Sequence, residues 1–189
     1  MLKKGVQLIT LAIWIALVSA CTPILTSQPI ADNKGTRSLG TLYNDQLIES
    51  SAADAISRSS ILFASANVSV ISVNGIVLLI GQVPNEDTKI IAGGITRNIS
   101  NVRKVHNELL VSGPASGVVK ANDALITTKV KARMLAETDF PTSRIKVVTE
   151  NGVVYLMGLV TQAEANWAVG IASNASGIQR IVKVFEYID

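Results

Sequence analysis

The chain has 189 residues, of which 48% are hydrophobic, 16% charged and 4% aromatic. This composition suits one or two small domains and excludes a disordered chain, and the 13 glycines and 5 prolines follow no fibrous repeat. The net charge is +3, but Lys3 and Lys4 lie in a segment that we expect to be removed, which leaves 15 basic and 14 acidic residues. A net charge of +1 provides no long-range attraction for nucleic acid. The single cysteine excludes an internal disulfide framework and a CxxC site.

The N-terminal residues have the pattern of a secretory signal peptide. A short basic start is followed by an apolar run over residues 6–18 and by small residues before Cys21. The run is shorter than the ~20 residues that a membrane-spanning helix needs. We expect residues 1–20 to be a cleaved signal peptide. Residues 21–44, rich in Thr, Ser, Pro and Gly, are expected to form a flexible tether.

Residues 17–21, Leu-Val-Ser-Ala-Cys, resemble a bacterial lipobox. The resemblance implies that Cys21 becomes the first residue of the mature protein and carries acyl chains such as palmitate. Two or more chains anchor a protein stably, because each buried methylene contributes about 0.8 kcal/mol. Thr22 stands where the resemblance requires Asp for retention in the inner membrane, so it implies the periplasmic face of the outer membrane. The alternative is an unmodified cysteine after an ordinary signal peptide.

The rest of the chain contains an internal repeat with a period of about 77 residues. Residues 74–83 (NGIVLLIGQV) align position for position with residues 151–160 (NGVVYLMGLV). A period this long indicates a small domain rather than a solenoid unit. We expect one module over residues 45–112, a linker over 113–119 and a second module over 120–189.

The first copy is expected to begin with a helix over residues 46–64. Residues 68–73 alternate in the manner of a strand, and the Asn-Gly pair at 74–75 tolerates the positive φ of a type I′ hairpin turn. Residues 76–83 are almost wholly apolar, which predicts a strand that is buried on both faces or central in its sheet. A helix containing glycine and a third strand over residues 102–111 complete the copy.

The second copy repeats this order, with a helix over residues 123–136 and a third strand over 178–188. Its middle helix begins at a capping box in which Thr161 is the N-cap and Glu164 bonds back to it. The predicted fold class is therefore α+β, with two tandem α-β-β-α-β modules, each a small three-stranded mixed sheet carrying two helices. A module of about 65 residues is marginally stable alone, so we expect the two to pack together.

The repeated hairpin has the pattern G-x-V-x-L-x-G-x-V, preceded by alternating valines and followed by a helix and a last strand. Residues 70–83 with 100–105, and residues 147–160 with 176–181, carry it. In these residues the chain resembles the BON domain, a small module of the bacterial envelope. With its lipobox it resembles outer-membrane lipoproteins that contain two BON domains. The resemblance implies binding to phospholipid, anionic lipid above all, a role in envelope integrity, and no catalysis.

The helix at 123–136 is the expected site of lipid contact. Ile126, Val130 and Met134 form the stripe that should face the core. Leu125 and Leu135 fall outside that stripe, among cations, as in an interfacial helix whose apolar groups insert while its cations meet phosphate. We expect lipid contact from six residues: Leu125, Thr128, Lys129, Ala132, Arg133 and Leu135.

Two points qualify this site. In the alternative interpretation, the two leucines pack against the other module and the cations form a solvated face. In addition, the lipoproteins that the chain resembles carry an aromatic residue where this chain has Leu125, and leucine lacks the amphipathic ring suited to a membrane interface. We therefore expect the affinity of this site for lipid to be lower than in those lipoproteins. We also expect the second module, rather than the first, to bind anionic lipid.

The sequence contains no pattern of catalytic or metal-ligating residues. His106 is interpreted as an ordinary strand residue, and the chain has no GxSxG, HExxH, paired carboxylates or GxGxxG. We expect no enzyme activity, metal, cofactor, nucleic acid or small-molecule substrate. Trp167 is interpreted as a contact between modules, and the alternative is an exposed contact to a partner. The alternative function is that of a periplasmic adaptor that binds proteins of an envelope or cell-wall assembly.

Overall fold

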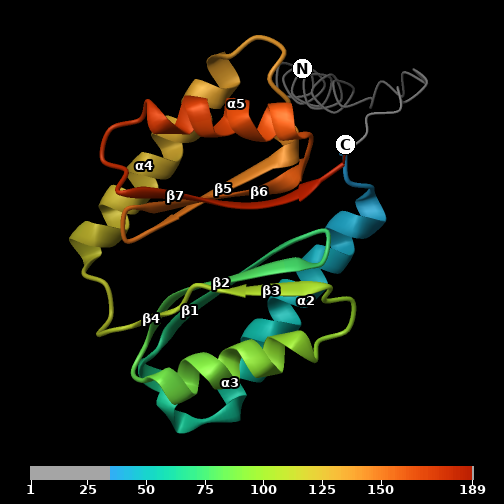
Figure 1. Cartoon of the computed structure of the whole chain (residues 1–189). Helices are drawn as coiled ribbons and strands as arrows, with labels where there is room; N and C mark the ends of the chain where they lie inside the picture. Colours follow the sequence, from blue (N-terminus) through green and yellow to red (C-terminus); the bar gives the residue numbers. More distant parts are fainter. Residues whose placement is uncertain (1–34, 189) are drawn as a thin grey trace, which may run out of the picture. The chain divides into compact units, whose positions relative to one another are not determined.

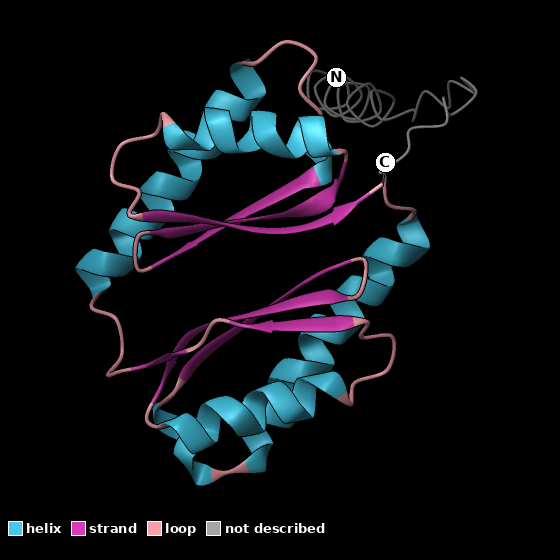
Figure 2. Cartoon of the chain, in the orientation of Figure 1, coloured by secondary structure: helices cyan, strands magenta, loops and turns pink. Residues whose placement is uncertain are grey.

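The structure is a computed structural model that describes residues 35–188. The expected signal peptide, Cys21 and residues 22–34 of the expected tether lie outside the described residues. Within the described part, the order α-β-β-α-β occurs twice (Figures 1 and 2). The predicted α+β class, with two tandem modules, is confirmed.

The first module is built around a central strand. Its elements are α2 (Leu39–Ser59), the short 3-10 helix η1 (Ile61–Ser65), β1 (Asn67–Val73), β2 (Ile76–Val83), α3 (Glu86–Arg97), β3 (Lys104–Asn107) and β4 (Leu110–Val111). Strand β2 pairs antiparallel with β1 and parallel with β3 and β4, so the sheet is mixed.

The second module has the same topology. Its elements are α4 (Gly117–Ala136), η2 (Thr142–Arg144), β5 (Ile145–Glu150), β6 (Val153–Val160), α5 (Gln162–Ser173) and β7 (Arg180–Tyr187). Strand β6 is central, antiparallel to β5 and parallel to β7. The predicted capping box at the start of α5 is confirmed, with Thr161 and Glu164 each bonding the other's backbone N–H.

Both hairpins turn on an Asn-Gly pair. Asn74 and Gly75 have φ angles of 52° and 73°, and Asn151 and Gly152 have φ angles of 48° and 72°. These are the left-handed conformations of a type I′ turn, which glycine and asparagine adopt at the lowest cost. The predicted turns are therefore confirmed.

The second glycine of the motif is needed for close packing between strands. A Cβ added at Gly158 would lie 2.4 Å from the carbonyl oxygen of Arg144, just before β5. The equivalent Gly81 faces the carbonyl of Asn67 on β1 in the same way. A side chain at either position would force the first strand away from the central one.

Each sheet is covered on both faces. Helices α2 and α3 cover one face of the first sheet, and α4 and α5 cover one face of the second. The remaining faces meet each other in a shared core that contains Ile71, Leu78 and Ile80 from one module and Tyr155 and Met157 from the other. All eight residues of β2 are buried, as predicted for a strand covered on both faces. The expected packing of the two modules is confirmed.

Both opening helices begin earlier than predicted. Helix α2 starts at Leu39, so residues 39–44 are helical rather than part of a tether, and it ends at Ser59 rather than near residue 64. Helix α4 starts at Gly117, inside the predicted linker. The cause is the same in each case, because Ser38 and Ser116 accept a hydrogen bond from the backbone N–H three residues on. These serines are N-caps. From the sequence they were assigned to the tether and to the linker, because serine is common in both kinds of segment.

The third strand of the first module is divided, whereas a single strand over residues 102–111 was predicted. Strands β3 and β4 are separated by Glu108 and Leu109, and the Asn107 side chain accepts a hydrogen bond from the backbone N–H of Leu109. This local bond lets Leu109 enter the core completely. The equivalent strand β7 is continuous.

Candidate functional site

The inward side of α4 belongs to the core of the second module. Ile126, Val130 and Met134 are fully buried against the sheet and α5, as predicted. Because an α-helix turns by about 100° per residue, the residues on the opposite side of α4 must face away from the module.

That opposite side is mainly apolar along the helix. Leu125 and Leu135 are 51% and 72% exposed, so they do not form the buried contact with the other module that the alternative interpretation required. Thr128 and Ala132 are exposed between them. The stripe continues toward the N-terminus through residues that were missed because the helix was expected to begin at residue 123. We call this stripe the α4 face, and it consists of Val118, Ala121, Leu125, Thr128, Ala132 and Leu135.

Cations lie along both edges of the α4 face. By helical position, Lys129 and Arg133 follow one edge, and Lys120 and Lys131 follow the other. Lys129 is half-buried, and its ammonium donates to the Ser176 hydroxyl at 3.2 Å. Residues 124–136 contain three cations and no Asp or Glu. The helix thus presents an apolar strip between two cationic edges.

Trp167 does not mediate contact between the modules, so that interpretation was wrong. It lies on α5 and stacks edge-to-face on Phe140 of the same module, with ring centroids 5.1 Å apart. Its ring also lines a hollow of about 340 Å³ between α5 and the end of α4, together with Arg133.

Two buried aspartates hold the hairpin turns, and sequence reasoning missed both. Asp123 of α4 accepts hydrogen bonds from the backbone N–H groups of Asn151 and Gly152, each at 2.8 Å. Asp45 of α2 accepts from the turn of its own module in the same way. The available signal was their equivalent position in the two opening helices. These carboxylates fix each hairpin to the helix that covers it.

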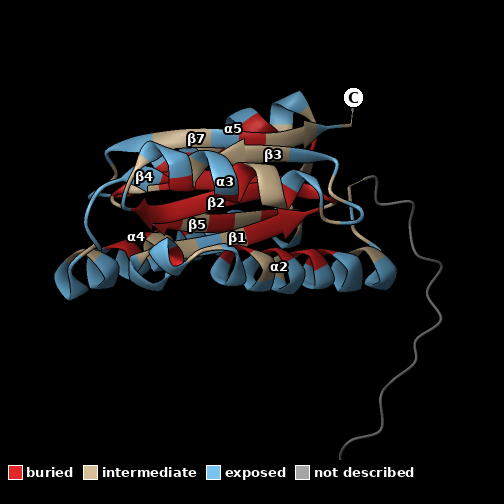
Figure 3. Ribbon diagram, turned by 90° about the horizontal axis from the view of Figure 1, so that it is seen from below, coloured by how far each residue is buried: buried red, intermediate tan, exposed pale blue. Residues whose placement is uncertain are grey.

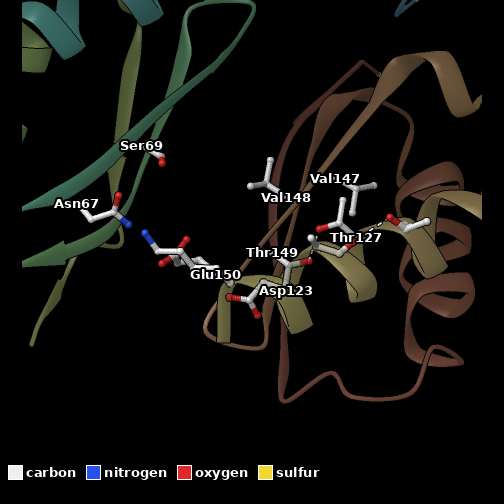
Figure 4. Close-up of a pocket in the computed structure, with 11 residues that line it drawn as sticks. Asn67, Ser69, Asp123, Thr127, Val147, Val148, Thr149 and Glu150 are labelled. Carbon is white, nitrogen blue, oxygen red and sulfur yellow. Dashed lines mark hydrogen bonds between the residues drawn. The ribbon is translucent and has the colours of Figure 1, made fainter. Parts of the chain in front are cut away.

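A cavity of about 540 Å³ lies where α4 faces the edge strand of the first module (Figure 4). Asn67 and Ser69 of β1 line one side, and Asp123, Thr127 and Glu150 are among the residues on the other. Several of its polar groups are already bonded within the protein: Asp123 to the turn, Thr127 to Thr149 at 2.7 Å, and Glu150 to Gln82. These bonds leave the two carboxylates in structural roles.

The pKa of the His106 imidazole on β3 is lowered, first by burial and then by the charge of Lys104, while Glu108 opposes the shift. The neutral imidazole is therefore favoured near pH 7.

Among residues 35–188, no three His, Cys, Asp or Glu side chains are grouped so that they could hold a metal ion. No helix in that range has the length and apolar character needed to cross a bilayer.

The fold and the repeated hairpin define a protein of two α+β modules joined through their sheets. Residues 44–113 and 122–189 both match the BON domain, and the chain belongs to this family. The chain is 40% identical over 153 residues to "Outer membrane lipoprotein DolP" of Haemophilus influenzae, covering 81% of this chain and 79% of that one. It is 34% identical over 153 residues to "21 kDa hemolysin" of Actinobacillus pleuropneumoniae, covering 80% and 78%. It is 32% identical over 120 residues to "Osmotically-inducible protein Y" of Escherichia coli, covering 62% and 60%. The predicted resemblance to a dual-BON protein of the DolP type is confirmed.

Proposed function

We propose that this protein is a non-enzymatic lipoprotein of the outer membrane, anchored on the periplasmic face through acylated Cys21. The protein supports the integrity of the envelope by binding anionic phospholipid through the α4 face. The name of the Haemophilus influenzae relative and the lipobox pattern support the anchor and the location. The exposure of the α4 face between cationic edges supports the lipid site.

The shape of α4 suits the boundary between head groups and acyl chains. Leu125 and Leu135 would insert while the cations at the edges meet phosphate. Each cation near an anionic leaflet contributes about 1 kcal/mol, and the effect falls off within a Debye length of about 8 Å at physiological salt. The contact is therefore weak and sensitive to salt.

A weak contact is sufficient for an anchored protein. An acyl group on Cys21 holds α4 near the bilayer at all times, so docking becomes an intramolecular step with a high effective concentration. The α4 face then determines how the protein is oriented on the membrane and which lipids it gathers.

Vesicle co-sedimentation tests the lipid site. The chain from residue 22 onward, which has no thiol to acylate, should bind phosphatidylglycerol vesicles but not phosphatidylcholine vesicles, and the binding should weaken with salt. Leu125→Glu should reduce binding at least tenfold, because it removes an inserting group and adds a negative charge. The matched control is Ile90→Glu on α3, where the wild-type side chain is 61% exposed and lies in the other module.

Two outcomes would contradict the proposal. If Leu125→Glu binds phosphatidylglycerol vesicles as well as the wild type does, the α4 face is not the site. If mass spectrometry of the protein from its native membrane finds Cys21 unmodified, the anchor is wrong.

A further inference from the structure

The N-terminal half of α2 also exposes an apolar strip. Leu39 and Tyr43 are 85% and 66% exposed, and Leu42 and Leu47 are about half exposed. The spacing i, i+3, i+4 and i+8 places these four residues on one side of the helix. The opposite side, through Ile48, Ala52 and Ile56, is buried in the core. We call the four exposed residues the α2 patch: Leu39, Leu42, Tyr43 and Leu47.

The α2 patch lies on the same side of the molecule as the α4 face. Helix α2 packs on edge strand β1, and α4 packs on edge strand β5. The two edges are joined, because Lys146 of β5 donates to Glu49 of α2 at 2.7 Å and because residues of β1 and α4 line one cavity. Figure 3 shows α2 and α4 along one side of the molecule, with their exposed surfaces turned outward. A flat surface that meets the α4 face therefore also meets α2.

The chemistry of the α2 patch differs from that of the α4 face. Arg37, just before α2, donates to the buried Asp45 at 2.9 Å, and Arg58 at the far end pairs with Asp54. The patch itself is three leucines and a tyrosine, whose amphipathic ring is typical of membrane interfaces. Such a surface suits the apolar boundary of a bilayer rather than lipid phosphate.

The position of α2 in the chain points to the same occupant. Leu39 follows Cys21 by 18 residues, and even a fully extended chain of that length spans no more than about 60 Å. Helix α2 is the first described helix after the proposed acylated residue.

We infer that the α2 patch is a second membrane contact, which inserts into the apolar boundary of the bilayer that holds Cys21 and acts together with the α4 face. This inference rests on the proposed function, since it takes the anchor and the docked α4 as given. The two contacts complement each other, because the cations of α4 select anionic lipid whereas the α2 patch binds independently of lipid charge and of salt.

Depth-dependent fluorescence quenching tests this inference. The full acylated chain is reconstituted in vesicles of phosphatidylethanolamine and phosphatidylglycerol that contain nitroxide-labelled lipid. Single cysteines carry the fluorophore, since Cys21 is the only native thiol and is blocked by acylation. Tyr43→Cys reports on the α2 patch, Leu125→Cys reports on the α4 face, and Ile90→Cys on α3 is the control. All three wild-type side chains are exposed, so the labels do not disturb the core.

The expected result is strong quenching at positions 43 and 125 and little at position 90. At about 0.5 M salt, quenching at 43 should persist better than quenching at 125. Quenching at 125 without quenching at 43 would overturn the α2 contact and leave the proposed function intact. Quenching at 43 alone would support the α2 contact and contradict the α4 site, and no quenching at either would overturn both. If position 43 is unquenched and Tyr43→Glu dissolves a dimer seen by analytical ultracentrifugation, the patch binds a second copy and the inference is wrong.

Discussion

Both terminal nitrogens of the Arg103 guanidinium donate to the carboxylate of Glu186, at 2.8 and 2.9 Å. Arg103 directly precedes β3 of the first module and Glu186 lies on β7 of the second, so the pair joins the two modules. The hydrogen bond from Arg103 lowers the pKa of Glu186, and Asn74 and the arginine charge add to this effect against the opposing effect of burial. The arginine side chain is more than half exposed, so water screens the pair and limits its energy.

The apolar contact between the sheets is expected to outweigh this ion pair. Met157→Ala, at a fully buried position in the shared core, should lower the free energy of unfolding by about 2–5 kcal/mol. Glu186→Gln should cost less than about 1 kcal/mol. Urea denaturation followed by circular dichroism measures both, and the wild type should unfold in a single transition because the modules share a core. Two separate transitions, or a larger loss for Glu186→Gln, would contradict this account.

Asp45 should make stability depend on pH. Burial raises the pKa of this carboxyl, but hydrogen bonds from Gly75, Ser72, Asn74 and Arg37 together lower it below its ordinary value. A lowered pKa in the folded state stabilises the protein above the unfolded value of about 3.9, and this stabilisation is lost as the pH falls through the folded value. Asp45→Asn should cost about 1–3 kcal/mol at pH 7 and reduce the loss of stability below pH 4.

Chemical denaturation at pH 7 and at pH 3 measures both effects of Asp45→Asn. The matched control is Asp54→Asn on the exposed side of the same helix, where the change should stay within about 0.5 kcal/mol. Equal losses for the two variants at pH 7 would show that Asp45 does not hold the turn.

The motif glycine Gly158 should not tolerate even a methyl group. Gly158→Ala should destabilise the protein by about 1–3 kcal/mol, because the new Cβ would collide with the Arg144 carbonyl. Gly94→Ala is the contrasting change, since a Cβ there meets nothing within 4 Å inside α3. It should stabilise the protein by about 0.5–1 kcal/mol, because alanine loses less backbone freedom in a helix. Thermal unfolding compares the two variants. An unchanged melting temperature for Gly158→Ala would show that position 158 does not require glycine.

His106 should titrate at a lower pH than a free histidine, because burial and Lys104 favour the neutral ring. An NMR titration of the imidazole carbons should give a midpoint below 6.5. Lys104→Gln should raise the midpoint, and Glu108→Gln should lower it further. A wild-type midpoint above 6.5 would contradict the burial of the ring.

Local patterns predicted much of the fold. The Asn-Gly pairs specified two hairpins because few residues tolerate positive φ, and the spacing of Ile126, Val130 and Met134 identified the inward side of α4 because helical periodicity is regular. The helix starts at Leu39 and Gly117 were missed, since a capping serine has the same composition as a linker. The outward position and the exposure of Leu125 were predicted, but the sequence left open the alternative that the other module covers it, and only the structure decided between the two.

The sequence by itself determined the repeat, the α-β-β-α-β order, the family and the cationic, apolar character of α4, because each depends on residues close together in the chain. Only the tertiary structure decided that the free faces of the two sheets cover each other, that Asp45 and Asp123 hold the turns, and that α2 and α4 share one side. These relationships depend on residues 28 or more positions apart in sequence, and no local period encodes which distant partners will exclude water together.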